Sequence, residues 1–484
     1  MTPSVFTCAA GSKASEIDIA YGWNNTNNAR AVLERHWDTF ITEADFQYLA
    51  SIGINTVRLP IGYWNLGPSF VQGTDYGQAA QVYENSWPRV VRAINQAGDA
   101  GIGVLVDLHG AVGSQNGQQH SGVSNGQTKL FSDEGNMEKT ISVLTYLMQQ
   151  LVTVNNVVGV QVLNEPSYDS GLEPFCMFPL HLSKELEFLP SLVPGSRAIN
   201  AMRGVHPVAQ NFPIYVHDAF DAHRFSNFVA ARQDFIVQDH HSYFVFTPSD
   251  AQESGSQHTQ DVKGVIATDL AYTSERVKRN MIIGEWSCAL MPESLEKEEA
   301  AEKVRKDFGH AQISVYANKT AGWAFWCSCS HRNSTTLADF LTVAYKKESC
   351  DSDPGWCFKK AVGTCLPSSF NVKSKSKRAD TTSDSIPNPR WLLPDSIPHR
   401  FEAIHQRDDL GTQSTDPASR SFSKGYEDGL KAAIQFADFN NSKLGFTGQY
   451  ILDALYLAQP SPVAFGTEEN YRQGFMRGLA EGER

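Results

Sequence analysis

The sequence has few cysteines, no long apolar segment and no long basic run, and each of these features is typical of a particular class of protein. Eight cysteines are few for 484 residues, and their spacings match no zinc template, so we expect free thiols or one incidental disulfide. No segment is apolar for long enough to span a bilayer. The net charge is −12 and no long basic run is present, which argues against nucleic acid or an anionic membrane surface as the partner.

The N-terminal segment also lacks a recognisable targeting signal. Residues Met1–Phe6 contain no charged region followed by an apolar stretch, so the sequence predicts no signal peptide. Taken alone, this favours a cytoplasmic protein if Met1 is the true start.

Apolar, strand-like runs alternate with amphipathic stretches over the first two thirds of the chain. This alternation predicts βαβ units and a parallel sheet. We therefore expect an α/β fold of the (β/α)₈ barrel type with its first strand missing, because seven runs are found and a closed barrel has eight. The expected strands are Ile54–Ile61, Gly103–Gly110, Val157–Pro166, Pro213–Phe220, Phe235–Tyr243, Met281–Ser287 and Ala321–Trp326, and the clearest helices are Trp87–Ala100, Asn136–Leu151 and Leu295–Ala317.

Composition divides the chain into three parts. Residues 1–366 carry the strand and helix pattern. Residues 367–420 are rich in Ser, Asp, Pro and Lys, which is typical of a disordered linker. Residues 421–484 turn apolar again and contain a short repeat, Ser423–Leu430 and Arg472–Leu479, with glycines four residues apart. This spacing predicts a small helical extension in which two helices pack closely, without chemistry of its own.

Two carboxylates stand where an α/β barrel keeps its chemistry. Glu165, in Asn164-Glu165-Pro166, follows one apolar run, and Glu285, in Gly284-Glu285-Trp286, ends another. The carboxyl ends of parallel strands carry the active sites of such barrels. Two acids there suggest glycoside hydrolysis, and a pair about 5–5.5 Å apart would give retention of configuration. This chemistry requires no metal and no cofactor.

Neighbouring residues suggest that one of the two acids is ionised and the other protonated. Asn164 can bind a sugar 2-hydroxyl. Tyr243 and Arg58 can donate to Glu285 and keep it ionised. The charge of Glu285, together with burial, should raise the pKa of Glu165 so that it holds a proton near neutral pH.

Taken singly, several of these residues have an ordinary structural explanation. Arg58 could belong to a buried ion pair, His109 and His241 could be hydrogen-bonded core histidines, and Trp326 could be a core side chain. Their order along the chain favours a site, because Arg, His, Asn-Glu, His-x-Tyr, Glu and Trp fall at successive strand ends.

In this ordered set the chain resembles the family 5 glycoside hydrolases, and among them the fungal exo-β-1,3-glucanases. The resemblance covers roughly residues 2 to 366. The strings that carry it are Val57–Trp64, Asp107–Gly117, Leu163–Pro166, His240–Phe246 and Gly284–Ser287.

The resemblance implies roles for individual residues. Glu165 corresponds to the acid/base and Glu285 to the nucleophile. Other positions correspond to contacts around the substrate: His109, Asn164, His241 and Tyr243 at the cleaved sugar, Phe246 as an aromatic platform at the next subsite, and His120 where the family often has Asn. It also implies a β-1,3-glucan polysaccharide or oligosaccharide as substrate, a monomer, and a secreted or cell-wall enzyme of glucan catabolism or fungal cell-wall metabolism.

The chain departs from the family pattern in three places. The family opens with a glycine-rich strand that carries a sugar-binding Glu, and this strand is not found before Thr2–Phe6. Two inserts, 176–196 and 327–341, interrupt the pattern, and we interpret both as retained introns, with genuine loops as the alternative. Other functions therefore stay open: a cellulase or mannanase type of β-glycosidase, or a non-catalytic glucan-binding protein.

Overall fold

A computed structural model describes residues 5–168, 171–172, 175, 197–327, 355–370, 416–438, 451, 455 and 463–482. Two compact units are present. The first contains the described residues up to 370, and the second contains the two C-terminal helices. Each unit is described by itself. Residues 176–196, 328–341 and 371–415 lie outside the described residues, so the insert and linker hypotheses stay predictions.

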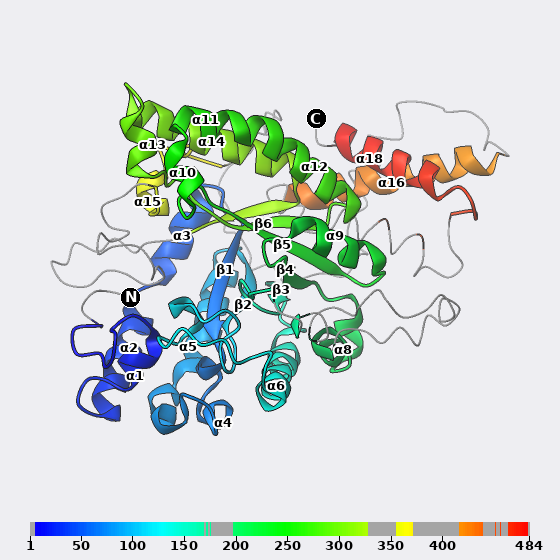
Figure 1. The fold of residues 1–484 in the computed structure, drawn as a ribbon. Helices are drawn as coiled ribbons and strands as arrows, with labels where there is room; N and C mark the ends of the chain where they lie inside the picture. The colour runs from blue at the N-terminus through cyan, green and yellow to red at the C-terminus, as the bar shows by residue number, and fades with distance from the viewer. Residues whose placement is uncertain are drawn as a thin grey trace, which may run out of the picture. The chain divides into compact units, whose positions relative to one another are not determined.

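Seven parallel strands form one sheet in the order in which they occur along the chain. They are β1 (Thr56–Gly62), β2 (Gly103–Gly110), β3 (Val157–Gln161), β4 (Ile214–His217), β5 (Ile236–Ser242), β6 (Met281–Trp286) and β7 (Gly322–Phe325). The predicted parallel barrel and all seven predicted strands are confirmed. Figure 1 shows the strands at the centre, with α5 (Ser86–Asp99) and α6 (Glu134–Leu151) on one side and α12 (Ala267–Arg276) and α14 (Ala301–Lys319) on the other.

The first strand of the barrel is missing, as expected. Between Val5 and Thr56 the described chain contains only the helices α1 (Glu16–Ala20), α2 (Thr26–Thr39) and α3 (Glu43–Ser51). Strands β1 and β7 each pair with a single neighbour. Most of their residues are half-buried, whereas β2 and β6 are buried almost throughout. The edges of the sheet thus lie where an eighth strand would close the barrel.

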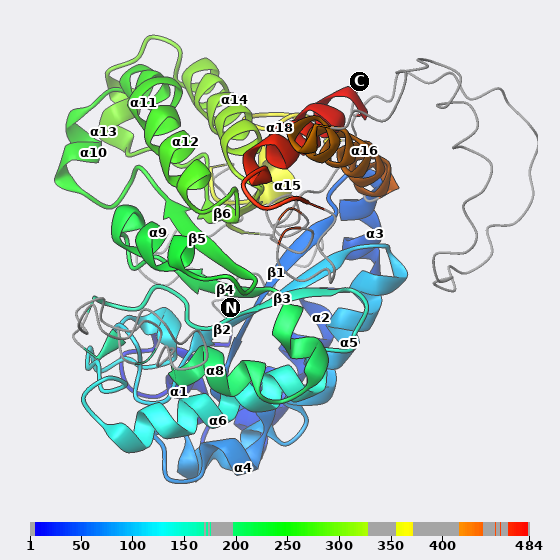
Figure 2. The ribbon, with the colours of Figure 1, turned by 90° about the vertical axis from the view of Figure 1, so that its right-hand side faces the viewer.

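Helices follow most strands and cover the outside of the sheet, as seen from a second direction in Figure 2. Among the described residues, the first unit also contains the α-helices α4 (Pro68–Val71), α8 (Arg197–Arg203), α9 (Ala222–Ala231), α10 (Pro248–Gln252), α11 (Gly255–Asp261), α13 (Pro292–Glu296) and α15 (Phe358–Ala361). The same residues include short 3-10 or π segments at Tyr63–Leu66, Gly77–Tyr83, Gln119–Ser121, Pro207–Asn211 and Val262–Ile266. The predicted helix Leu295–Ala317 is divided into α13 and α14.

The inward-facing side chains change from apolar to polar along the strands. Leu105, Tyr215, Val237 and Ile282 form one apolar cluster. Because side chains alternate between the two faces of a strand, residues two and four positions further on share that face. On β2 these are Asp107 and His109, and on β5 they are Asp239 and His241. The sheet therefore presents its polar layer towards the carboxyl ends of the strands.

The second unit consists of α16 (Pro417–Asp438) and α18 (Glu468–Gly482). A side chain at Gly425 or Gly429 would overlap the carbonyl oxygen of Tyr471 or Phe475, and the α18 glycines Gly474 and Gly478 meet the carbonyls of Phe422 and Tyr426 in the same way. The contacts advance in the same direction on both helices, so the pair is parallel. The predicted close packing of the two repeats is confirmed. No helix among the described residues is both long and apolar enough to cross a bilayer.

A glycine inside the sheet offers a test of this packing. A Cβ atom at Gly159 would overlap the ring of Tyr215, whereas one at Gly264 would meet nothing within 4 Å. We expect Gly159→Ala to lower the free energy of unfolding by about 1–3 kcal/mol, because a packed interior resists added volume. Gly264→Ala should change it little. Urea denaturation of both variants checks this, and equal stability of the two would contradict it.

Candidate active site

A single buried arginine joins the strand ends into one site. Arg58 of β1 donates to Gln161 (Nε–Oε1 2.9 Å), to Asn164 (Nη2–Oδ1 2.7 Å) and to Glu285 (Nη1–Oε1 2.7 Å). Its Nη2 also lies 3.0 Å from Oδ2 of Asp107. Burial alone would lower the pKa of Arg58, but the charges of Asp107 and Glu285 outweigh burial and raise it. The guanidinium therefore stays charged and fixes two predicted site residues, Asn164 and Glu285, around it.

A second chain of contacts runs from β2 to the end of β7. His109 bonds Asp107 through Nδ1 at 2.7 Å, its Nε2 lies 3.4 Å from Nδ2 of Asn164, and its ring stacks on Trp326 at 5.5 Å. The ring of His120 meets that of His109 edge-on at 5.3 Å. His109, His120 and Trp326, predicted separately, thus lie together.

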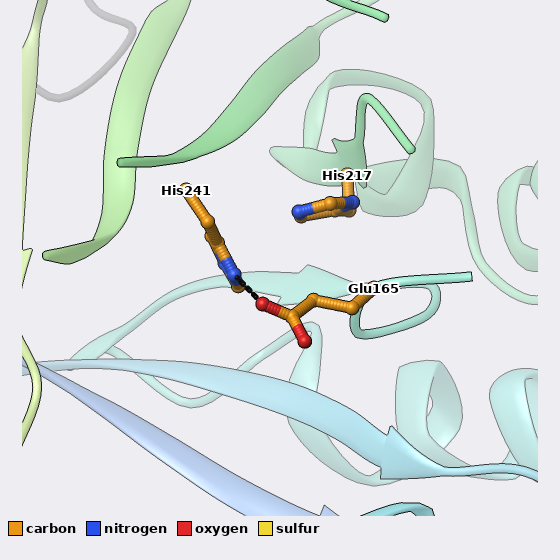
Figure 3. A group of neighbouring side chains, drawn as sticks. All are labelled: Glu165, His217 and His241. Atoms are coloured by element: carbon orange, nitrogen blue, oxygen red, sulfur yellow. Dashed lines mark hydrogen bonds and ion pairs between the residues drawn. The ribbon is translucent and has the colours of Figure 1, made fainter. Parts of the chain in front are cut away.

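Glu165 lies beyond the end of β3 in a strained backbone conformation. Its φ of 40° is in the left-handed region, which a non-glycine residue adopts at a cost of about 1–3 kcal/mol and chiefly at functional sites. Asn116 donates to its carbonyl oxygen at 2.9 Å. The carboxylate accepts from His241 Nδ1 at 2.7 Å, and His120 Nε2 lies 3.7 Å away. Figure 3 shows the bond between Glu165 and His241.

Glu285 faces the same space because β6 contains a bulge. The pairing of β5 with β6 shifts between His240 and His241, which pair with Ile283 and Glu285 and leave Gly284 as an extra residue. A bulge re-aims the side chain that follows it. A side chain at Gly284 would overlap the carboxylate of Asp239, so the position requires glycine. Tyr243 donates to Oε2 of Glu285 at 2.8 Å.

The two carboxylates are close together. His241 Nδ1 lies 2.7 Å from one oxygen of Glu165 and 3.5 Å from one oxygen of Glu285. These two oxygens are therefore at most about 6.2 Å apart, which fits the spacing of about 5–5.5 Å in retaining glycosidases better than the 6.5–9.5 Å of inverting ones.

The expected direction of the pKa shift of Glu165 is wrong. Burial raises the pKa of Glu165, but the hydrogen bond and charge of His241 outweigh burial and hold it below its usual range. Burial raises the pKa of Glu285, and His241 and Arg58 offset only part of this rise. The reason is that His241 faces Glu165 directly. Burial would lower the pKa of His241, but Glu285 and Asp239 raise it well above its usual value.

Aromatic rings border the site. Phe246 is 53% exposed, and its ring meets that of Tyr243 edge-on at 5.2 Å. Trp356 lies 5.7 Å from Tyr243 and 6.2 Å from Phe246 between ring centroids. Phe220 is 59% exposed and its centroid lies 6.5 Å from that of His241. Exposed aromatic faces of this kind suit sugar rings.

The structure thus brings together every side chain that the sequence predicted for the site, and it adds others. The additions on the strands are Asp107, Gln161, His217 and Asp239, and those on loops are Gln115, Phe220 and Trp356. Nε2 of Gln115 donates to the backbone oxygens of His109 and Asn164 at 2.7 and 2.9 Å. Period-two spacing from His109 and His241 could have located Asp107 and Asp239. No local pattern identifies Trp356, which follows a segment outside the described residues.

Two groups of side chains have the composition of metal ligands within the described part of the chain. In each, the ligand atoms lie within 4.8 Å of one another: Glu165, His217 and His241 in the site, and Glu253, His258 and Asp261 elsewhere. Neither is required by the chemistry of two carboxylates.

Comparison with known proteins agrees with this geometry. The profile of the family "Cellulase (glycosyl hydrolase family 5)" matches residues 18–332, which hold both acids and all seven strands. The chain belongs to glycosyl hydrolase family 5.

Named relatives of this family 5 chain include proteins of yeasts. It is 31% identical to "Glucan 1,3-beta-glucosidase 3" of Schizosaccharomyces pombe over 65% of this chain and 63% of the relative. It is 31% identical to "Glucan 1,3-beta-glucosidase" of Kluyveromyces lactis over 60% and 63%, and 32% identical to "Sporulation-specific glucan 1,3-beta-glucosidase" of Saccharomyces cerevisiae over 54% of each. The chain thus spans less than two thirds of the length of these relatives.

Removing the charge of Arg58 tests the network. Arg58→Met leaves Asp107 and Glu285 buried without their cation, and we expect a loss of about 3–5 kcal/mol in the free energy of unfolding. Arg30→Met, which removes half-exposed ion pairs to Glu34 and Glu84, should cost about 0–1 kcal/mol. Guanidinium denaturation at pH 7 checks both. Similar losses of unfolding free energy in the two variants would show that Arg58 stabilises the fold no more than a surface ion pair does.

The buried pair of Asp218 and His240 gives a pH-dependent prediction. Oδ2 of Asp218 lies 2.8 Å from Nδ1 of His240. Burial raises the pKa of Asp218, but His240 outweighs burial and lowers it from 3.8 to about 2. For His240, burial lowers the pKa from 6.5, but Asp218 outweighs burial and raises it.

A depressed acid stabilises the fold above its unfolded pKa, and a raised base stabilises it below its unfolded pKa. The pair should therefore contribute most between about pH 4 and 6.5. Asp218→Asn should lower stability by about 1–3 kcal/mol in that window, and the difference should shrink as the pH falls towards 2. The exposed pair Asp269–His223 supplies the control, Asp269→Asn, with little effect. Urea denaturation of the wild-type protein and both variants from pH 2 to 8 tests this prediction. A stability difference between Asp218→Asn and the wild-type protein that does not vary with pH would contradict it.

Proposed function

We propose that this chain is a retaining glycoside hydrolase that cleaves β-1,3-glucan and releases glucose from the non-reducing end. The observation that carries the proposal is the pair Glu165 and Glu285, which share His241 as a neighbour at 2.7 and 3.5 Å. The names of the yeast relatives support the glucan linkage and the glucose product.

In the first step, Glu285 attacks the anomeric carbon as the nucleophile. The glycosidic C–O bond breaks as the bond from Oε to carbon forms, and Glu165 gives its proton to the departing oxygen. Arg58 and Tyr243 donate to the two oxygens of Glu285 at 2.7 and 2.8 Å. These donors orient the nucleophile and support its ionised form. Asn164, bonded to Arg58, can meet the 2-hydroxyl of the same sugar.

The proton for this step is shared by Glu165 and His241. In the free site, the opposed pKa shifts of these two residues favour the proton on His241 Nδ1, 2.7 Å from the carboxylate. A bound sugar excludes water from the site. An ion pair is costly to desolvate, so substrate binding favours the neutral pair, in which Glu165 carries the proton.

In the second step, water replaces the leaving group. Glu165, now ionised, takes a proton from the water, the water oxygen bonds to the anomeric carbon, and Glu285 departs as a carboxylate. The products are glucose in the β-configuration and a shortened glucan. Phe246, Trp356 and Phe220 supply aromatic faces for the sugars on the leaving side.

Replacing the nucleophile tests the proposal. Glu285→Gln keeps the shape of the side chain but removes its nucleophilic charge, so we expect glucose release from laminarin to fall by about 10³-fold or more. Glu293→Gln, on the exposed first turn of α13, should be fully active. Proton NMR should show the β-anomer first, and activity on laminarin should exceed that on cellulose and mannan.

Each alternative has its own outcome. Higher activity on cellulose or mannan would replace the glucan assignment with another β-glycosidase. Oligosaccharides as first products would replace the exo mode. Binding of laminarin without sugar release by the wild-type protein would make this chain a glucan-binding protein.

A further inference from the structure

A histidine beside Glu165 has no part in the mechanism given above. His217 is the last residue of β4 and is 1% exposed. Its ring meets that of His241 edge-on at 4.3 Å. In Figure 3 one of its ring nitrogens is turned towards the other two side chains. Its Nε2 has no hydrogen-bond partner among the described residues, although a buried polar group is costly to leave unpaired.

The backbone after β4 fixes which nitrogen carries the proton. The Ala219 amide donates to Nδ1 of His217 at 3.0 Å. An amide N–H can only donate, so Nδ1 must be the unprotonated acceptor, and the proton of the neutral ring lies on Nε2.

The turn that makes this contact is strained. Ala219 and Phe220 both have positive φ, 48° and 62°, a conformation that costs a non-glycine residue about 1–3 kcal/mol. Asp218 holds the turn by accepting from the Phe220 amide at 3.1 Å. The strained turn therefore positions the Ala219 amide that fixes the tautomer of His217.

His217 is also neutral. Burial, followed by the charge of His241, lowers its pKa to about 4. A neutral ring with Nε2–H presents a hydrogen-bond donor, without a full charge, to the space between His241 and Glu165.

The same three side chains have the spacing of a zinc site, since their ligand atoms lie within 4.8 Å of one another. A metal needs a lone pair on each ligand nitrogen. The lone pair of His217 is on Nδ1 and is used by the Ala219 amide. The hydrogen bond thus argues for a donor, and the nearest acceptor in the group is the carboxylate of Glu165.

We propose that His217 is a positioning residue for Glu165: its Nε2–H is the donor that receives the Glu165 carboxylate once that group has given up its proton. This inference rests on the proposed function, because it assigns Glu165 an acid form and a base form. Before the first step, the proton shared with His241 holds the Glu165 carboxylate, so Glu165 needs no second donor. Once the leaving group has taken that proton, the base form, which activates water, gains His217 as a donor.

Other titratable groups also face Glu165, and the test must separate them. They are His241 of β5, Tyr243 just after β5, His120 in the loop after β2, Arg58 of β1 and Glu285 of β6. Around His217 itself the groups are His241, Asp218, Asp239 and Glu165. Variants of His217 alone leave all of these in place.

The first measurement needs no enzyme activity. In the full chain labelled with ¹⁵N-histidine, His217→Gln identifies the His217 signals among the 14 histidines. We expect one-tautomer spectra with the proton on Nε2 from pH 5 to 8. A proton on Nδ1, or a ring that becomes charged near pH 6, would overturn the inference. So would Zn²⁺ binding, measured by calorimetry, that is lost in His217→Gln.

The second measurement separates the two chemical steps. With a dinitrophenyl β-glucoside the first step needs little acid assistance, so kcat reports the water step. His217→Phe removes the donor, and we expect kcat to fall about 10-fold while kcat/KM changes less than about 2-fold. The alkaline limb of kcat/KM on laminarin should move up by about one pH unit, because the ionised form of Glu165 has lost a donor.

Two further variants serve as controls. His217→Gln places an amide N–H near the position of Nε2 and should recover most of kcat. Val216→Ala, which removes buried apolar volume from the same strand, should lower the Tm but leave the ratio of the two kinetic constants and the pH limb unchanged.

The outcomes distinguish the inference from the function. If wild-type protein cleaves neither substrate, the proposed function fails, and the tautomer measurement still decides whether His217 is a fixed donor. If wild-type protein is active and His217→Phe lowers kcat and kcat/KM equally, with no shift of the pH limb, His217 is structural and the inference is wrong.

Discussion

The active site depends on the burial of one cation among several anions. Arg58 is held at hydrogen-bond distance from Gln161, Asn164 and Glu285, and its charge also faces Asp107. Without this charge, the carboxyl groups of Asp107 and Glu285 would lie buried without their cation, which is costly in a space of low dielectric. The guanidinium therefore permits a polar layer inside the sheet, and that layer includes the candidate acid Glu285. Arg58 does this from β1, which is an edge strand in this chain.

Much of the fold could be read from the sequence because parallel strands are buried on both faces. Runs such as Val104–Val106 and Met281–Ile283 are apolar without interruption, and each predicted strand is found within a few residues. The ends of strands and helices were harder to predict. Asn164 and Glu165 lie beyond the last paired residue of β3, because a loop can leave the sheet while the sequence still looks strand-like. The break between α13 and α14 was also missed, because helical periodicity continues across it.

The members of the site could be predicted, but the direction of the pKa shift of Glu165 could not. The residue types and their order indicate which side chains meet at the strand ends. The bulge at Gly284 decides that Glu285 turns inward, and simple alternation would have placed it with Ile283 on the other face. The direction of His241 towards Glu165 decides where the proton lies. Both are properties of three-dimensional contacts between strands, and neither has a counterpart in local spacing.

The backbone of Glu165 has a consequence for how this position can change. A φ of 40° is unstrained for glycine but strained for glutamate. Selection for stability alone would therefore favour replacing Glu165, and so would any engineering screen that scores only thermal resistance. A glutamate kept at this position is maintained against the preference of the fold. Residue 165 is therefore the position in the site where the proposed function and the stability of the fold make opposite demands.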